Sequence, residues 1–146
     1  MSLSETLKNQ IKEDLQRHEG KVMSIYLDTE ELKTGGIGHL VQQDQWEVGD
    51  ELSDAQVDEW FEEDFKEATT DACALFLNFE SHPDNVQRVC VNMAFNLGRS
   101  RLAKFKKMIG YVNEGSYAKA SNEMVDSKWY RQVKGRGKEL VGIMNG

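Results

Sequence analysis

The chain has 146 residues, of which 39% are hydrophobic and 29% are charged, and its formal net charge is −7. This composition is ordinary for a soluble globular protein, and a chain of this length can bury one compact core. No stretch approaches the ~18 uninterrupted apolar residues of a membrane span, and the first residues lack the apolar region of a signal peptide. We therefore expect synthesis in the cytoplasm and no stable membrane insertion.

The charge is divided unevenly between the two halves of the chain. Residues 1–71 carry 6 basic and 19 acidic side chains, a balance of −13, whereas residues 72–146 carry 12 basic and 6 acidic, a balance of +6. Two explanations fit this asymmetry equally well: two differently solvated surfaces, or a basic lobe that faces an anionic partner. Charge alone does not choose between a bacterial cell wall and nucleic acid as that partner.

Periodicity and turn signals predict a helix, a small sheet and a long helix in the first half. Apolar residues recur every four positions behind a serine that can cap the helix, which predicts a helix over residues 4–18. Strand-forming residues at 22–27 and 36–41 predict a small antiparallel sheet. The capping box Ser-Asp-Ala-Gln then begins a helix predicted over residues 53–79, with a length of roughly 39 Å.

The second half is predicted to form shorter helices. Pro83 suits the first turn of a helix whose apolar residues continue to Leu97, either on two sides or on one broad face, and Gly98 is expected to end it. Further glycines punctuate the helical segments that follow. Cys73 and Cys90 are expected to be buried core thiols, because the cytoplasm disfavours disulfides.

The most specific pattern is E-x8-D-x5-T followed by GGIGHL, which starts at Glu19 and includes Asp28 and Thr34. Hydrolysis of a glycosidic bond needs one protonated carboxyl and one ionised carboxylate. A helix that ends at Glu19 and a hairpin that carries Asp28 would supply both groups. The competing interpretations are an ordinary helix-end glutamate, an aspartate that satisfies its own turn, and a threonine that merely favours a strand.

Three segments of this chain resemble the phage-type lysozymes, and in particular their T-even branch. They are RHEGKVMSIYLDTEELKTGGIGHL, CVNMAFNLG and SKWYRQVKGRGKEL, which lie at residues 17–40, 90–98 and 127–140. The resemblance implies a mostly α, two-lobed α+β fold with a small antiparallel N-terminal sheet and a helical C-terminal lobe. In this arrangement residues 1–146 form a single domain with two lobes. One lobe covers about residues 15–55, and the other covers about residues 80–146 plus the N-terminal helix. The helix at about 53–79 joins them.

The resemblance also implies roles for individual residues. Glu19 would be the general acid, and Asp28 and Thr34 would hold the attacking water. Arg136 matches an arginine that pairs with the catalytic glutamate, although it is also one charge in a solvated basic run. Leu40, Phe95, Asn96 and Met108 match positions that contact the sugar, although the first two suit a plain core equally well.

His39 invites a reading as a metal ligand or a base. No second histidine or cysteine lies at ligand spacing from it, so we expect a structural histidine bonded to a nearby carboxylate. The resemblance implies neither a metal nor any other cofactor.

Taken together, these observations predict an endolysin that cleaves the β-1,4 bond between N-acetylmuramic acid and N-acetylglucosamine in peptidoglycan, with inversion. It would wait in the host cytoplasm as a monomer and reach the periplasmic wall after a holin opens the membrane, which releases phage by cell lysis. The alternatives are a lytic transglycosylase and a non-catalytic wall-binding module. A nucleic-acid binder is disfavoured, because no recognisable module with stacking aromatics is present.

Three departures from the family pattern bear on this prediction. Glu31 stands where the family's hairpin turn normally contains glycine, so a different turn is expected. Met108 and Glu123 stand where the T-even branch has a hydroxyl and an amide. The acidic N-terminal half differs from the strongly basic surface of that branch, which predicts weaker or more salt-dependent affinity for the wall.

Overall fold

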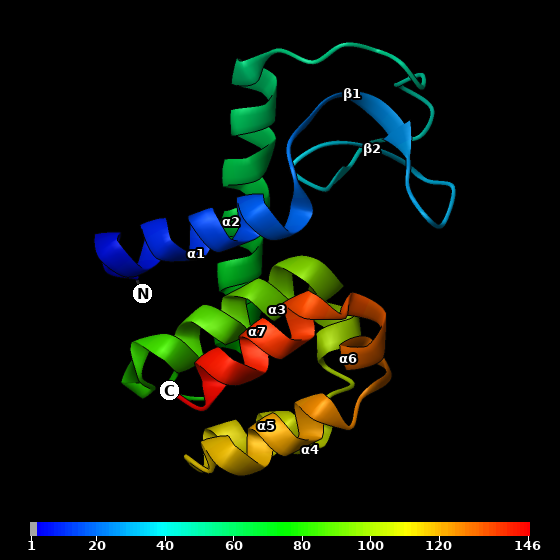
Figure 1. Ribbon diagram of the computed structural model, residues 1–146. Coiled ribbons are helices and arrows are strands. Elements are labelled where there is room, and N and C mark those ends of the chain that lie inside the picture. Colours follow the sequence, from blue (N-terminus) through cyan, green and yellow to red (C-terminus); the bar gives the residue numbers. More distant parts are fainter. Residues whose placement is uncertain (1–2) are drawn as a thin grey trace. The chain divides into compact units, whose positions relative to one another are not determined.

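The computed structural model describes residues 3–146, which are mostly helical and include one three-stranded antiparallel sheet (Figure 1). This architecture confirms the predicted α+β class. The chain forms two compact units, which we call the sheet unit (residues 12–67) and the helical unit (residues 3–11 and 68–146). Both boundaries between the units fall inside helices, so two helices run from one unit into the other.

The first of these helices is α1, Glu5–Glu19, close to its predicted bounds. The Ser4 hydroxyl accepts a hydrogen bond from the Leu7 amide at 3.2 Å, which confirms the predicted N-cap. Gly20 ends the helix in the left-handed region, with φ of 77°. The predicted apolar stripe is buried throughout, at Leu7, Ile11 and Leu15.

The sheet follows α1 and has the strand order β1-β2-β3. Figure 1 labels its first two strands. Strand β1 spans Val22–Leu27 as predicted, β2 spans Lys33–Gly36 and β3 spans His39–Leu40. The prediction of one strand over residues 36–41 is therefore wrong. Two left-handed glycines within those residues turn the chain, so the second strand lies earlier and the third is short.

Helix α2, Asp54–Leu75, begins with the predicted cap, because the Ser53 hydroxyl accepts from the Gln56 amide at 3.1 Å. Its buried residues recur at the spacing of an amphipathic helix. They are Val57, Phe61, Phe65, Ala68 and Ala72. The prediction that it reaches residue 79 is wrong. Asn78 adopts a left-handed φ of 52°, and a short 3₁₀ turn at Phe79–Ser81 replaces the last helical turn.

The helical unit is organised around α3, Asp84–Leu102, which begins directly after Pro83. Residues on all sides of α3 are buried, including Asn92 with no exposed surface, so the two-sided burial is confirmed. Gly98 breaks the helical geometry with φ of 77° and ψ of 165°, but the chain resumes a helical course to Leu102. The expected end at Gly98 is therefore a kink.

Four shorter helices complete the helical unit, with α7 packed on α3 and α5 on α4 (Figure 1). They are α4 at Lys106–Asn113, α5 at Tyr117–Val125, α6 at Lys128–Val133 and α7 at Gly135–Met144. No helix in residues 3–146 is long and apolar enough to cross a membrane.

Both cysteines are free thiols, as predicted. Cys90 is fully buried, and burial raises the pKa of its thiol above the ordinary range. Cys73 is only half-buried, so the prediction of a core position holds for one thiol and not fully for the other.

Candidate active site

The carboxyl group of Glu19 lies at the end of α1, against the glycine turn between β2 and β3. A Cβ atom placed on Gly38 would lie 2.6 Å from Oε1 of Glu19 and 3.1 Å from its Cδ. Gly38 also has a φ of 65°, which side-chain-bearing residues rarely adopt. The absence of a side chain at Gly38 is therefore what gives the half-buried Glu19 carboxyl its position.

Asp28 follows β1 and closes the hairpin with its own side chain. Its Oδ1 accepts hydrogen bonds from the amides of Glu30 at 2.8 Å and Leu32 at 2.9 Å. The backbone amide of Asp28 donates to the Leu32 carbonyl at 2.9 Å, and the Glu31 amide donates to the Asp28 carbonyl at 3.0 Å. Asp28 is thus the turn aspartate considered from the sequence, and its carboxylate is fixed by two backbone donors.

The hairpin turn keeps a left-handed residue despite the missing glycine. Glu31 adopts a φ of 61°, a conformation that costs a non-glycine residue about 1 kcal/mol or more. The expectation of a turn that differs from the family's stays a prediction. The two amides held by Asp28 lie on either side of Glu31 and stabilise the strained residue between them.

Thr34 lies on β2 with its side chain on the same face of the hairpin as that of Asp28. In the antiparallel register Thr34 is paired with Tyr26, and Asp28 is bonded to Leu32. Paired residues share a face of the hairpin, and so do residues two positions apart on a strand, so all four side chains lie on one face. Thr34 is 5% exposed, and its hydroxyl donates to the Leu32 carbonyl at 3.0 Å. Because its proton is engaged, this hydroxyl has only its lone pairs left for a further hydrogen bond.

Tyr26 is linked electrostatically to the two predicted catalytic carboxylates. The pKa of its phenol is raised by burial first, then by the charge of Glu19 and then by that of Asp28. Both carboxylates therefore act on one phenol on the face that carries Thr34. Sequence reasoning missed Tyr26, although its position two residues before Asp28 placed it on the same strand face.

His39 makes the predicted bond to a carboxylate. Its Nδ1 lies 2.7 Å from Oδ2 of Asp64 on α2, and its ring stacks on Trp60 with centroids 4.4 Å apart. Leu40, the next residue, is 56% exposed at the end of the sheet. Within residues 3–146 no group of three or more histidine, cysteine, aspartate or glutamate side chains could hold a metal ion.

The other predicted site residues belong to the helical unit. Asn96 accepts a hydrogen bond from the Trp129 indole at 2.8 Å, and Phe95 beside it is half-buried. Met108 is 1% exposed and lines a cavity of about 320 Å³ together with Glu123 and three lysines. The cavity thus brings together the two positions that depart from the T-even pattern.

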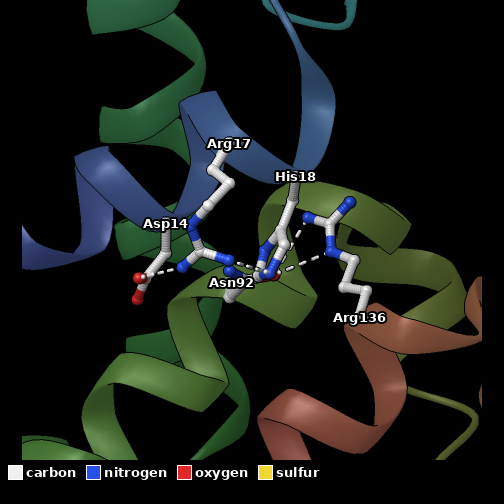
Figure 2. Close-up of polar contacts among 5 residues, drawn as sticks. All are labelled: Asp14, Arg17, His18, Asn92 and Arg136. Atoms are coloured by element: carbon white, nitrogen blue, oxygen red, sulfur yellow. Dashed lines mark hydrogen bonds and ion pairs between the residues drawn. The ribbon is translucent and has the colours of Figure 1, made fainter.

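Arg136, on α7, is directed toward Asn92 of α3 (Figure 2). Its Nε and Nη2 both donate to Oδ1 of Asn92, at 3.0 and 2.9 Å. In the last turns of α1, Arg17 donates to Asp14 at 2.9 Å and lies 3.4 Å from a ring nitrogen of His18 (Figure 2). The pairing of Arg136 with Glu19 stays a prediction.

Comparison with known proteins identifies the family. A sequence model described as phage lysozyme matches residues 16–145 of the chain. The chain belongs to the phage lysozyme family. It is accordingly a lysozyme-type cell-wall hydrolase, a glycosidase of a family that acts on peptidoglycan.

Three curated relatives agree with this membership. Probable T4-type lysozymes 2 and 1 of Dictyostelium discoideum are 26% and 25% identical to the chain, covering 91% and 92% of it and 92% of each relative. The pre-baseplate central spike protein Gp5 of Enterobacteria phage T4 is 32% identical over 90% of the chain, which matches 27% of that protein.

Proposed function

We propose that this phage lysozyme hydrolyses the β-1,4 bond between N-acetylmuramic acid and N-acetylglucosamine with inversion at the anomeric carbon. The observation that carries the proposal is the shared face of the hairpin. On that face, a carboxylate fixed by two amides follows β1, and a hydroxyl whose proton is engaged lies on the neighbouring strand β2. Such a pair can accept both hydrogens of one water molecule.

In this mechanism Glu19 protonates the glycosidic oxygen as the bond breaks. Asp28 and Thr34 accept the hydrogens of the attacking water, which leaves an oxygen lone pair directed at the anomeric carbon. Asp28 takes one proton of that water as the new C–O bond forms, and Glu19 is left ionised. Inversion requires the two carboxyl groups to lie roughly 6.5–9.5 Å apart, with the water between one of them and the sugar.

Residues of both units are assigned to the substrate under this proposal. We assign Leu40, Phe95, Asn96 and Met108 to binding of the glycan, as the family resemblance implies. The three lysines beside Met108 favour an anionic portion of the wall polymer, such as the lactyl or peptide carboxylates attached to muramic acid. The basic balance of the second half of the chain is consistent with that assignment.

The biological role follows the same proposal. The enzyme acts as a monomeric endolysin that reaches the periplasmic wall from the host cytoplasm after a holin has permeabilised the membrane, and wall cleavage then lyses the host. The 32% identity to part of a phage spike protein supports a second candidate role for this chain, as the hydrolase part of a larger phage assembly.

Mass spectrometry of muropeptides released from purified peptidoglycan tests the reaction. Hydrolysis adds one water to each cleaved bond and yields free reducing ends. Anhydro-muropeptides lighter by one water would instead establish a lytic transglycosylase. Wall binding without released fragments would establish a non-catalytic module, and either result would overturn the proposed hydrolysis.

A further inference from the structure

The sheet unit contains a hollow of about 470 Å³ that the proposed mechanism does not involve. Of the residues discussed above, His39 and Leu40 line it. One side of it is formed by the segment from β3 to Trp46, and the other by the first half of α2. The indoles of Trp46 and Trp60 both line it and both are half-buried. We propose that this hollow is a saccharide subsite that binds a neutral N-acetylglucosamine unit of the glycan strand.

The aromatic side chains that line the hollow pack against one another without a ligand. The Trp60 ring is stacked at 15° on His39, which is itself bonded to Asp64 at 2.7 Å. Trp46 meets Trp60 edge to face, with centroids 5.3 Å apart and an interplanar angle of 75°. Each ring is therefore fixed by another, and a pre-organised apolar surface binds a ligand without the cost of ordering it.

The polar side chains that line the hollow suit a ligand that carries hydroxyl and amide groups. Gln42, Gln45 and Gln56 line the hollow, and within the described part of the chain their side-chain amides make no hydrogen bond. Each amide offers two donors and one acceptor oxygen, which matches the hydroxyls and the N-acetyl group of an amino sugar. A pyranose ring also has an apolar C–H face, which suits an indole surface.

The charge of the hollow decides between the two sugars of peptidoglycan. Glu63 lines it, Asp64 lies behind His39, and no lysine or arginine is found among the described residues that line it. An anionic lactyl or peptide carboxylate, or a phosphate, would be repelled there. N-acetylglucosamine carries no charge and is accepted, so the hollow is specific for the neutral unit of the alternating polymer.

The hollow adjoins the reactive residues along the chain. Leu40 lines it and is exposed, and Gly38, two residues earlier, lies against the Glu19 carboxyl. A glycan cleaved at Glu19 can therefore extend over Leu40 toward the two indoles. This inference rests on the proposed function, since it assumes a glycan substrate, and it adds a subsite that favours long strands.

The test uses the full chain carrying Glu19→Gln, so that binding is measured without hydrolysis. Tri-N-acetylchitotriose, a neutral oligomer of N-acetylglucosamine, is titrated by calorimetry into this protein and into versions that also carry Trp46→Ala or Gln45→Ala. We expect the dissociation constant to rise about tenfold for Trp46→Ala and by less for Gln45→Ala. The matched control is Val48→Ala, which removes an exposed apolar side chain two residues away and outside the hollow.

Two outcomes would refute the proposed subsite. One is no binding of the trisaccharide, and the other is an affinity unchanged by both Trp46→Ala and Gln45→Ala. Should Trp46→Ala lower the melting temperature, the exposed Gln45→Ala variant decides the question. Parallel release of muropeptides by the otherwise unaltered chain separates the two proposals. Cleavage with unchanged affinities refutes only the subsite, and Trp46-dependent binding without cleavage refutes only the activity.

Discussion

The sheet unit and the helical unit differ in how their functional residues are held in place. In the sheet unit Glu19, Asp28 and Thr34 lie within sixteen consecutive positions, and a turn, a strand register and a glycine fix them. In the helical unit the corresponding contacts join residues far apart in the chain, such as Arg136 with Asn92 and Trp129 with Asn96. Local sequence therefore specifies the proposed catalytic residues, and tertiary packing specifies the other proposed substrate contacts.

The two units also differ in charge. The sheet unit carries 5 basic and 17 acidic side chains, a balance of −12, and the helical unit carries 13 basic and 8 acidic, a balance of +5. A neutral sugar in the sheet unit and anionic groups at the helical unit would each meet a compatible field. Under our proposals, the sheet unit carries the chemistry and recognises a neutral sugar, and the helical unit recognises the charged parts of the wall.

The largest expected effect is in the sheet unit. Glu19→Gln removes the acid proton while preserving the shape of the side chain, and we expect the rate of muropeptide release to fall by about 10²–10⁴. Glu13→Gln, an exposed substitution in the same helix, is the control and should retain full activity. Equal rates for the two variants would remove Glu19 from the reaction.

The second effect tests the glycine that positions the acid. Gly38→Ala places a methyl group 2.6 Å from the Glu19 oxygen, and we expect kcat to fall by about 10²-fold, because the carboxyl must move. Gly115→Ala is the control in the helical unit, since Gly115 has a similarly left-handed φ of 80° but no atom within 4 Å of the added Cβ. Comparable losses of kcat in both variants would mean that backbone strain, and not displacement of Glu19, causes the effect.

A third effect belongs to the helical unit and concerns stability. Trp129 is 4% exposed, donates to Asn96 and contacts the Phe105 ring edge to face. Trp129→Phe leaves the Asn96 oxygen without its donor, so we expect the free energy of unfolding to fall by about 1–3 kcal/mol. Urea denaturation measures it, and an unchanged midpoint and slope would show that this distant contact does not stabilise the unit.

The smallest effect reports how the two carboxylates act on Tyr26. The raised pKa of the phenol means that the folded state keeps the proton after the unfolded state has lost it. This contribution to stability is therefore complete below about pH 10 and is lost as the pH rises further. In NMR titrations of ring-labelled tyrosine, Glu19→Gln and Asp28→Asn should each lower the pKa of Tyr26. A pKa that neither substitution moves would contradict the electrostatic link.

The sequence predicted more of the sheet unit than of the helical unit, for physical reasons. The cap at Ser4 and the strand at Val22–Leu27 both depend on neighbours in the chain. The errors arose at left-handed residues. Gly36 and Gly38 divide a segment that strand propensity made continuous, and Asn78 ends α2 early.

Other features were beyond sequence reasoning because they depend on packing between distant segments. The stacking of Trp46, Trp60 and His39 brings a loop, a helix and a strand together, and no spacing rule indicates it. The close approach of Gly38 to Glu19 depends equally on how α1 meets the glycine turn. Glu31 is a further case, since it adopts a φ of 61°, a conformation that favours glycine, although it carries a side chain.

The most direct test of the proposed chemistry is the anomeric form of the sugar released at the moment of cleavage. Proton NMR recorded during digestion of a peptidoglycan glycan by the unaltered chain distinguishes the new reducing ends before they equilibrate. Attack by a water held by Asp28 and Thr34 predicts that the α-anomer appears first. Initial appearance of the β-anomer, or the absence of any new reducing end, would contradict the assigned roles of Asp28 and Thr34.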